Sequence, residues 1–351
     1  MTSSAKLRVL VAEDSPTARA LLVEILRSDP GLEVVGEAAN GIEAVEMTRR
    51  LRPDVVTMDI RMPLMDGLAA TREIMAETPT PIVIVTASFE RRDVEISMQA
   101  LRAGALSVLP KPIGTGSPGF PEECRQLKTT VKAMAGVKVV RRWRERPPAR
   151  QRPAGWVAKP RVVAVAASTG GPAALQQLLS ALPVDFPVPM LVVQHIAPGF
   201  VSGLASWLDA VSPLEVKVAE EGETLRAHHV YFAPDGRDLG VSDRGTVSLS
   251  IPRAGSLHCP SATPLFESVA QVYGASALAV ILTGMGKDGL EGLASIKRAG
   301  GRVVAQDEET SVIFGMPAAA IDAGLADLVL PLASIASMLA ELTNGPDRRS
   351  P

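Results

Sequence analysis

The sequence has little of several features that would point to particular classes of protein. Only two of its 351 residues are cysteines, Cys124 and Cys259, and they belong to no ligand pattern. Two isolated cysteines fit a reducing compartment and argue against a disulfide framework. The formal net charge is only −2, so neither nucleic acid nor an anionic membrane is favoured as a partner. We therefore expect no nucleic-acid partner.

No stretch has the layout of a membrane helix or a secretory signal. The uncharged segment Val162–Val184 is long enough to span a bilayer, but it contains Gly170, Gly171 and Pro172. A strand, a turn and a helix of a buried sheet explain this segment better. The N-terminal residues Met1–Arg8 are mostly polar and lead into a strand. We expect a cytoplasmic protein without direct membrane insertion.

Apolar strands and amphipathic helices alternate along both halves of the chain. This alternation predicts two doubly wound α/β domains with parallel sheets, of which the first is flavodoxin-like. In the first half, strands are predicted at Leu7–Ala12, Glu33–Ala38, Asp54–Met58, Pro81–Val85 and Ala105–Leu109, and helices at Pro16–Arg27, Gly41–Leu51, Gly67–Ala76, Val94–Ala103 and Glu122–Ala135. In the second half, strands are predicted at Val162–Ala166, Met190–Gln194, Leu214–Val218, Val230–Phe232, Ala277–Leu282, Val303–Ala305 and Ala326–Leu330.

A basic, proline-rich segment separates the two halves. Between Arg141 and Arg161 eight residues are basic, whereas Glu145 is the only acid. Such a segment cannot bury a core, and it is either a solvated spacer or a docking segment for an acidic surface; we favour the spacer. The predicted domains are therefore residues 6–136 and 161–343, joined by a linker at 137–160.

Acidic and phosphate-binding side chains follow the strands of the first half. Glu13 and Asp14 follow the first strand, Asp59 the third, Thr86 the fourth and Lys111 the fifth. The carboxyl ends of parallel strands meet at one edge, so these side chains should converge. Clustered carboxylates are best tolerated around a hard cation such as Mg²⁺. One of them is suited to accept a phosphoryl group, with Lys111 and Thr86 binding its oxygens.

This arrangement, with the motifs Asp59–Gly67 and Leu109–Pro112, resembles the receiver domain of two-component response regulators. The resemblance implies that Asp59 accepts the phosphoryl group from a histidine kinase. It also implies that Glu13, Asp14 and Asp59 hold the Mg²⁺ ion.

Val108 departs from the pattern of that family. Three residues before the lysine, receivers usually carry an aromatic switch residue, and this chain has valine. Phosphorylation then signals either without an aromatic rotation or with weaker coupling, and the sequence leaves both open.

Ser168 stands where the strand Val162–Ala166 ends and a Ser-Thr-Gly-Gly-Pro turn leads into a helix predicted at Ala173–Leu182. A hydroxyl there lies at the carboxyl edge of a parallel sheet, beside the N–H groups of a helix N-terminus. Those are the requirements of a nucleophilic serine. A serine that merely caps the helix fits the same position, so Ser168 alone decides nothing.

Two further strand ends bring an imidazole and a carboxylate to the same edge. His195 directly follows Met190–Gln194, and Asp288 lies in the glycine-rich turn Leu282–Gly289. Each alone suits a structural histidine or a helix-capping aspartate. Together with Ser168 they meet the needs of acyl transfer: the serine attacks, His195 carries the proton, and Asp288 orients the imidazole.

Four motifs surround these residues, namely Ala166–Pro172, Gln194-His195, Leu282–Gly289 and Gly315–Pro317. They resemble the catalytic domain of the chemotaxis protein-glutamate methylesterases over about residues 160–342. The resemblance implies hydrolysis of γ-glutamyl methyl esters on chemoreceptors, with release of methanol, and deamidation of receptor glutamines. It assigns Ser168, His195 and Asp288 to a triad, and Thr169 and Met285 to the oxyanion pocket. No cofactor is expected for the esterase.

Two residues depart from the family pattern. Ala166 stands where glycine is usual, and Thr263 stands where aspartate is common. The first is a small change. The second leaves open which receptor is recognised.

The two halves together predict a phosphorylation-activated esterase of sensory adaptation. Its expected partners are methyl-accepting chemoreceptors as substrates and a chemotaxis histidine kinase as phosphodonor. Our hypothesis is that the unphosphorylated receiver covers the Ser168 edge, and that phosphorylation of Asp59 favours an open state. Two alternatives stay open: a phosphorylation-gated adaptor of a non-motility pathway with weak or no esterase activity, and a serine amidase or peptidase.

Overall fold

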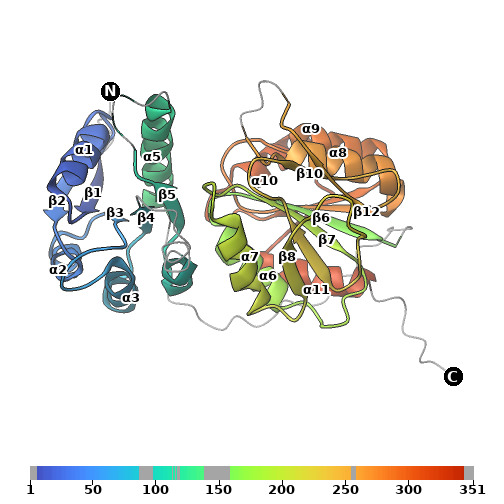
Figure 1. Ribbon diagram of the computed structural model, residues 1–351, viewed down its shortest axis with the longest axis horizontal. Coiled ribbons are helices and arrows are strands. Elements are labelled where there is room, and N and C mark those ends of the chain that lie inside the picture. The colour runs from blue at the N-terminus through green and yellow to red at the C-terminus, as the bar shows by residue number, and fades with distance from the viewer. Residues whose placement is uncertain are drawn as a thin grey trace. The chain divides into compact units, whose positions relative to one another are not determined.

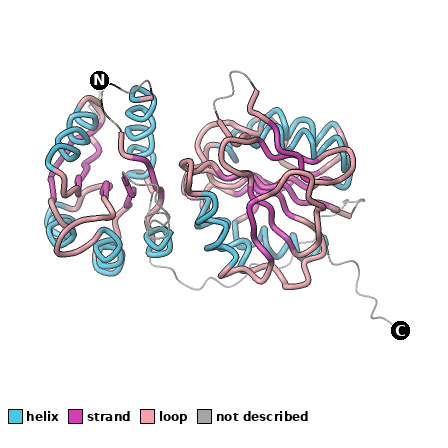
Figure 2. The backbone as a smooth tube through the Cα atoms, in the orientation of Figure 1, coloured by secondary structure: helices cyan, strands magenta, loops and turns pink. Residues whose placement is uncertain are grey.

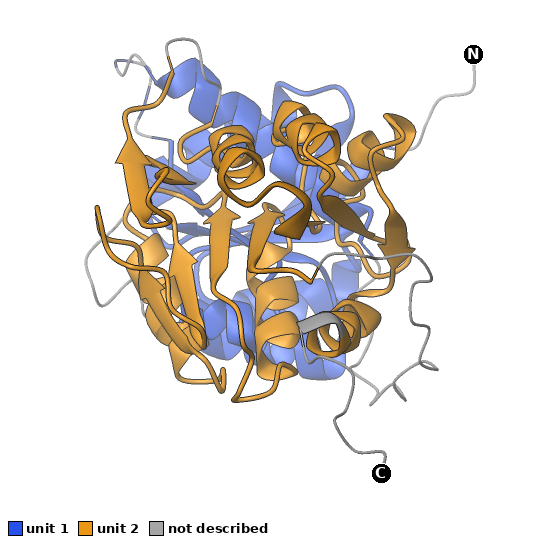
Figure 3. Ribbon diagram, turned by 90° about the vertical axis from the view of Figure 1, so that its right-hand side faces the viewer, with its two compact units in different colours: residues 1–144 blue, residues 145–351 orange. Residues whose placement is uncertain are grey.

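The computed structural model describes residues 6–86, 98–112, 114, 116, 119–137, 159–253 and 258–343. The chain divides into two compact units, Met1–Arg144 and Glu145–Pro351, which Figure 3 colours separately. In each unit, helices pack on a central parallel sheet (Figure 2). The predicted fold class is confirmed. Residues 138–158, which hold most of the predicted linker, lie outside the described part, as do residues 94–97 of one predicted helix.

The first unit is built on a five-stranded parallel sheet in the order β2-β1-β3-β4-β5. Its strands are β1 (Leu7–Ala12), β2 (Leu32–Ala38), β3 (Val55–Met58), β4 (Ile82–Thr86) and β5 (Ser107–Pro110). Its helices with assigned bounds are α1 (Pro16–Arg27), α2 (Gly41–Leu51), α3 (Gly67–Glu77) and α5 (Phe120–Ala135). Of these helices, α1 and α5 contact each other on one face, and α2 and α3 on the other (Figure 1).

The second unit is built on a seven-stranded parallel sheet in the order β14-β13-β12-β6-β7-β9-β8. Its strands are β6 (Val162–Ala167), β7 (Met190–Gln194), β8 (Glu215–Val218), β9 (His229–Phe232), β12 (Ala277–Ile281), β13 (Arg302–Gln306) and β14 (Leu328–Leu330). A separate antiparallel hairpin joins β10 (Asp238–Val241) to β11 (Val247–Ser250).

Helices cover both faces of this sheet. They are α6 (Gly171–Ser180), α7 (Val201–Asp209), α8 (Ala262–Tyr273), α9 (Leu290–Arg298), α10 (Met316–Asp322) and α11 (Leu332–Thr343). Helices α8, α9 and α10 lie on one face, and α6, α7 and α11 on the other (Figure 1). Both faces of the central strands are therefore buried, and every residue of β6 is buried. A strand covered on both sides needs the near-continuous apolar run that the sequence has there.

Some elements start earlier than predicted, for local reasons. Helix α6 begins at Gly171 rather than Ala173, because Pro172 suits the first turn of a helix. Helix α8 begins at Ala262, where the Ser261 hydroxyl caps it by accepting from Thr263 N. No helix in the described ranges is long and apolar enough to cross a membrane.

Candidate functional site

The central strands of the second sheet bring the three predicted triad residues together. Ser168 directly follows β6, His195 directly follows β7, and Asp288 lies in the turn between β12 and α9. Strand β6 lies between β7 and β12, in parallel register with both. The N–H of His195 donates to Ala167 O at 3.0 Å, and that of Ser168 donates to Thr283 O at 3.0 Å. Backbone pairing therefore brings these strand ends to one edge of the sheet.

A short hydrogen bond joins the imidazole to the carboxylate. His195 Nε2 lies 2.9 Å from Asp288 Oδ2, and both side chains are largely buried. A charged carboxylate can only accept, so in the neutral imidazole the proton sits on Nε2 and the lone pair on Nδ1. Burial by itself raises the pKa of Asp288, but the bonds from His195 and from the start of α8 outweigh it and lower the pKa to about 2. Asp288 is thus ionised at any working pH.

The start of α8 holds Asp288 in place, a contact that the sequence did not reveal. Ser261 Oγ donates to Asp288 Oδ1 at 2.7 Å, and the N–H of Ala262 donates to Oδ2 at 2.6 Å. Thr263 Oγ1 lies 3.5 Å from Oδ1 and accepts from Gly289 N at 3.1 Å. The hydroxyl of Thr263 therefore packs beside the Asp288 carboxylate without adding a second negative charge.

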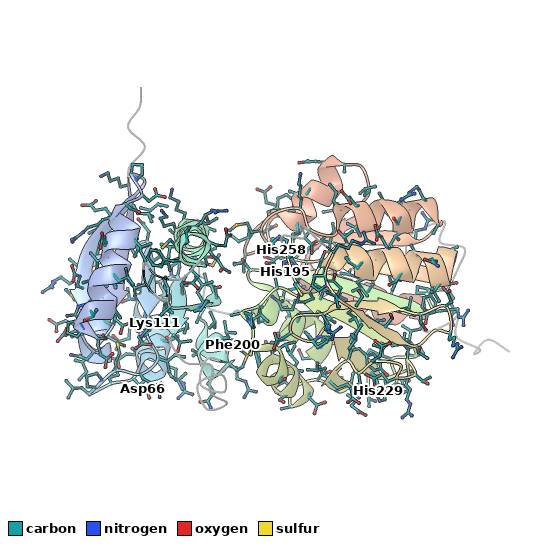
Figure 4. All side chains as sticks on the ribbon, turned by 45° about the horizontal axis from the view of Figure 1, so that its top comes forward. Asp66, Lys111, His195, Phe200, His229 and His258 are labelled. Carbon is teal, nitrogen blue, oxygen red and sulfur yellow. The ribbon has the colours of Figure 1, made fainter. Side chains whose placement is uncertain are left out.

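A second histidine covers one face of His195. The rings of His195 and His258 are stacked, with centroids 4.5 Å apart and planes 9° apart (Figure 4). Partial desolvation lowers the pKa of His258, and the neighbouring His195 lowers it further, although Asp288 opposes the effect. No local pattern in the sequence points to this contact between the two imidazoles.

The nucleophile candidate lies against a glycine of the β12–α9 turn. A Cβ on Gly284 would come within 2.7 Å of Ser168 Cβ and 2.5 Å of Met316 Sδ. Only glycine allows these backbones to approach so closely. In the described part of the chain, no hydrogen bond holds Ser168 Oγ. The hydroxyl is therefore free to turn toward an incoming substrate.

Two hydrogen bonds fix the backbone on either side of the Thr169 Cα atom. The carbonyl of Ser168 accepts from Gly171 N at 2.8 Å, and the carbonyl of Thr169 accepts from Thr283 Oγ1 at 2.9 Å. In a trans peptide the C=O and the following N–H point in opposite directions. The N–H of Thr169 is therefore turned away from the start of α6, and it has no acceptor among the described residues.

The same construction recurs at Met285. The carbonyl of Gly284 accepts from Gly315 N at 3.1 Å and from Met316 N at 2.8 Å. The N–H of Met285, in the same peptide, points the other way and has no acceptor within the described ranges. Two such N–H groups beside the serine make a place where an oxyanion can bind.

In the first unit, the carboxyl edge of the sheet gathers the predicted acidic cluster. Carboxylate oxygens of Glu13, Asp14 and Asp59 lie within 4.8 Å of one another. Lys111 Nζ lies 2.7 Å from Glu13 Oε2 and 2.9 Å from Asp59 Oδ2 (Lys111 is labelled in Figure 4). Thr86 ends β4 at the same edge and is 4 % exposed, and its carbonyl accepts from Lys111 N at 2.9 Å. All five predicted side chains belong to this edge.

Burial of this cluster shifts the pKa values of its side chains. Burial raises the pKa of both Glu13 and Asp59. Hydrogen bonds from Lys111 lower these pKa values, but by less, so the net shift is upward. Burial by itself lowers the pKa of Lys111, but hydrogen bonds with the two carboxylates outweigh it and raise the pKa. Hard oxygen donors of this kind fit a Mg²⁺ ion.

The backbone of Asp59 packs directly against Gly67, for which the sequence alone suggested no role. A Cβ on Gly67 would lie 1.9 Å from Asp59 O, so no other residue fits there. Asp66 caps α3 by accepting from Ala69 N at 2.7 Å.

Val108, in place of the expected aromatic, is 7 % exposed within β5.

Each half of the chain matches a protein-family model. Residues 163–339 match the family model described as CheB methylesterase, and residues 9–117 match that of the response regulator receiver domain.

Named relatives cover nearly the whole chain. The "Protein-glutamate methylesterase/protein-glutamine glutaminase 4" of Myxococcus xanthus is 59% identical over 97% of this chain and 98% of its own length. A similarly named protein of Anaeromyxobacter dehalogenans is 56% identical over 95% and 98%. Among solved structures, the CheB methylesterase catalytic domain of Thermotoga maritima covers 53% of this chain and 99% of its own, at 42% identity and a TM-score of 0.50.

Proposed function

This chain belongs to the CheB methylesterase family, and from that premise we propose that it hydrolyses glutamate γ-methyl esters of chemoreceptors under control of its own receiver domain. It is a protein-glutamate methylesterase, as its high-identity relatives are named. The observation that carries the proposed mechanism is the 2.9 Å contact between His195 Nε2 and Asp288 Oδ2 beside the strand end that bears Ser168.

In the proposed first step, Ser168 Oγ attacks the ester carbonyl. Because Asp288 holds the proton on Nε2 of His195, Nδ1 carries the lone pair that takes the serine proton. The new C–O bond forms as the carbonyl π electrons move to oxygen. The resulting oxyanion accepts from the N–H groups of Thr169 and Met285.

Collapse of the oxyanion expels methoxide, which takes the proton from His195 and leaves as methanol. Water, deprotonated by the same Nδ1, then attacks the acyl-serine. As the bond from the acyl carbon to Ser168 Oγ breaks, His195 returns the proton to Oγ, which releases the glutamate carboxylate and restores Ser168. A glutamine side chain enters the same sequence with ammonia as the leaving group. Deamidation therefore needs no residue beyond those of the esterase.

The receiver edge supplies the proposed control. Asp59 is the proposed phosphoacceptor, with Lys111 and the Thr86 hydroxyl binding the phosphoryl oxygens, and a chemotaxis histidine kinase is the phosphodonor. Glu13, Asp14 and Asp59 would hold Mg²⁺. The ion, when bound, neutralises charge on the phosphoryl oxygens. The esterase itself requires no cofactor.

The proposed division of the chain follows these two chemistries. Residues 6–136 form the receiver, 137–160 the linker and 161–343 the esterase, and the unphosphorylated receiver restrains the esterase. Methyl-accepting chemoreceptors are the proposed substrates.

The test is methanol release from methylated receptor by the full chain, with and without a small phosphodonor. Ser168→Ala should abolish release, whereas Ser180→Ala, an exposed serine of α6, should leave it unchanged. A serine-directed organophosphate should label the wild type and not the Ser168→Ala variant. Full release by Ser168→Ala would overturn the nucleophile, and a wild type that neither reacts nor releases methanol would favour the adaptor.

A further inference from the structure

We propose that Gln194 is a positioning residue of the esterase: its side-chain amide clamps the Ser168 and His195 backbones to each other and so orients both the oxyanion site and the base. This inference rests on the proposed function of that edge. It assigns a role to a residue that touches neither the substrate nor the reacting atoms.

Gln194 is the last residue of β7 and is 2 % exposed. Its Nε2 donates to Ser168 O and to His195 O, both at 2.8 Å. One amide group thus uses both of its N–H bonds on carbonyls from two neighbouring strand ends. An amide nitrogen has two donors and no acceptor, so no other hydrogen bond remains for it.

The bond to Ser168 O fixes the direction of a proposed oxyanion donor. With the Ser168 carbonyl held at the amide, the N–H of Thr169 in the same trans peptide must point to the opposite side. The carbonyl also accepts from Gly171 N. Without Gln194 the peptide keeps only that turn bond, and it gains freedom to rotate. A donor that must be reoriented during the reaction stabilises an oxyanion less than one already in place.

The bond to His195 O acts on the base. It holds the backbone of the first residue after β7, while Asp288 holds Nε2 at the far end of the same side chain. The imidazole is therefore tied at both ends. Gln194 holds both the His195 carbonyl and the Ser168 carbonyl. The distance from nucleophile to base therefore depends on this side chain.

The Ser-Thr-Gly-Gly-Pro turn is shaped to receive this amide. A Cβ on Gly171 would lie 2.0 Å from Gln194 Oε1 and 2.8 Å from its Cδ. Gly171 is thus glycine because the Gln194 side chain occupies the space of its Cβ. The Oε1 atom is buried and has no hydrogen-bond partner among the described residues. It faces the first residue of α6, where the aligned peptide dipoles leave partial positive charge.

Gln306 offers a matched control within the same sheet. It ends β13, is 0 % exposed, and its Nε2 also donates to a backbone carbonyl, that of Thr310, at 2.8 Å. Its Oε1 accepts from Thr283 N at 2.8 Å. Among the described residues, Gln306 makes no hydrogen bond to residue 168 or 195, so it separates the loss of a buried amide from the loss of this clamp.

The test compares Gln194→Met and Gln306→Met in the full chain treated with phosphodonor. Methionine is close to glutamine in size and cannot donate to a carbonyl. For Q194M we expect kcat for methanol release to fall about a hundredfold with KM within about threefold, as for loss of transition-state stabilisation alone. For Q306M we expect a comparable drop in the midpoint of thermal unfolding and a kcat within about tenfold of wild type. Equal kcat losses in the two variants, or a Q194M defect confined to KM, would overturn the proposal.

Gly171→Ala provides a second route to the same state, because its Cβ displaces the amide instead of removing it. We expect its kcat loss to be similar to that of Q194M, and the double variant to be no slower than either single one by more than about threefold. Fully additive losses would mean that the two substitutions act independently, and would overturn the clamp.

A readout independent of ester turnover keeps this inference separable from the proposed function. The Nε2 proton of His195, bound to Asp288, should give a downfield proton NMR signal that Ser168→Ala and Q306M retain and Q194M shifts or loses. An unchanged signal in Q194M would overturn the clamp, even in an active esterase. A shifted signal in a chain that releases no methanol would refute the proposed function and leave the clamp standing.

Discussion

The carboxylate of Asp288 receives three short hydrogen bonds, and this number explains how it can stay charged while largely buried. Its donors are His195 Nε2, Ser261 Oγ and the N–H of Ala262. Bonds to the charged form favour ionisation, and here they outweigh the cost of burial. An acceptor held from three directions also holds its imidazole partner, so the ring of His195 is fixed at Nε2.

Asp288→Asn keeps the size of this side chain and removes its charge. Its amide can donate to Nε2 and favour the wrong tautomer, so we expect kcat to fall by about 10³ to 10⁴, with KM near that of wild type. Methanol release under substrate saturation measures the loss. Asp185→Asn, an exposed aspartate after α6, is the control and should stay within about twofold. An Asp288→Asn kcat within about tenfold of wild type would contradict the role of the charge.

The pKa of Asp288 also predicts how stability depends on pH. The folded value, about 2, lies below the ordinary value of 3.8, so the unfolded chain binds the proton first as the pH falls. The stabilisation is therefore complete above about pH 5 and is lost as the pH falls toward about 2. Between about pH 5 and pH 3, the difference in unfolding free energy between wild type and Asp288→Asn should shrink by about 1 kcal/mol. Urea unfolding at the two pH values measures it, and a constant difference would contradict the lowered pKa.

At the scale of elements, the turns after β6 and β12 pack against each other without room for a side chain. Gly170 has φ +79°, and a Cβ there would lie 2.5 Å from Val312 Cβ. Gly284 leaves no room for a Cβ beside Ser168. The glycines of these motifs therefore let two strand ends and the segment before α10 come together as one surface.

Gly284→Ala should disturb the site more than the fold. The added methyl must displace Ser168 or Met316, which costs about 1–3 kcal/mol of stability. Because small displacements of a nucleophile are costly, we expect kcat to fall by about a hundredfold. Gly136→Ala, whose added Cβ would meet nothing closer than Ala133 O at 3.6 Å, should leave both unchanged. Full methanol release by Gly284→Ala would show that the Ser168 turn tolerates movement.

The layered fold and its edges could be predicted from the sequence, because apolar runs end in turns that carry the polar residues. Strand β7 and the position of His195 after it follow from Met190–Gln194 alone. The support of the site could not be predicted in this way. Ser261 reaches Asp288 across 27 residues, and the Gln194 amide reaches Ser168 across 26, so neither contact leaves a local pattern. Only the pair Gly170-Gly171 in the turn after β6 indicated from the sequence that other groups pack closely there.

At the scale of the whole molecule, each compact unit has its own parallel sheet and its own charged edge. The acidic edge of the first unit contains no group of the proposed esterase mechanism, and the triad edge contains no phosphoacceptor. The proposed control of the esterase by the receiver would therefore act through the equilibrium between states of the chain.

Asp59→Asn tests that coupling. The variant lacks the proposed phosphoacceptor, so a small phosphodonor should no longer stimulate methanol release, while release without phosphodonor stays within about threefold of wild type. Asp66→Asn is the matched control, because asparagine caps α3 as well as aspartate does, and it should retain stimulation. Stimulation of Asp59→Asn equal to that of wild type would place the phosphoryl group elsewhere. Loss of stimulation in both variants would point to damage to the receiver instead.

The strand order of the second sheet has a consequence for biosynthesis. Ser168 and His195 are synthesised early, after β6 and β7, but Asp288 follows His195 by 93 residues and comes after β12, which pairs with the other side of β6. Until β12 is inserted, the nascent esterase has a serine and an imidazole without the carboxylate that fixes the tautomer. The receiver, by contrast, precedes them and is synthesised first. The receiver is thus present before the proposed triad is complete, and a chain interrupted before β12 has the receiver without the carboxylate of Asp288.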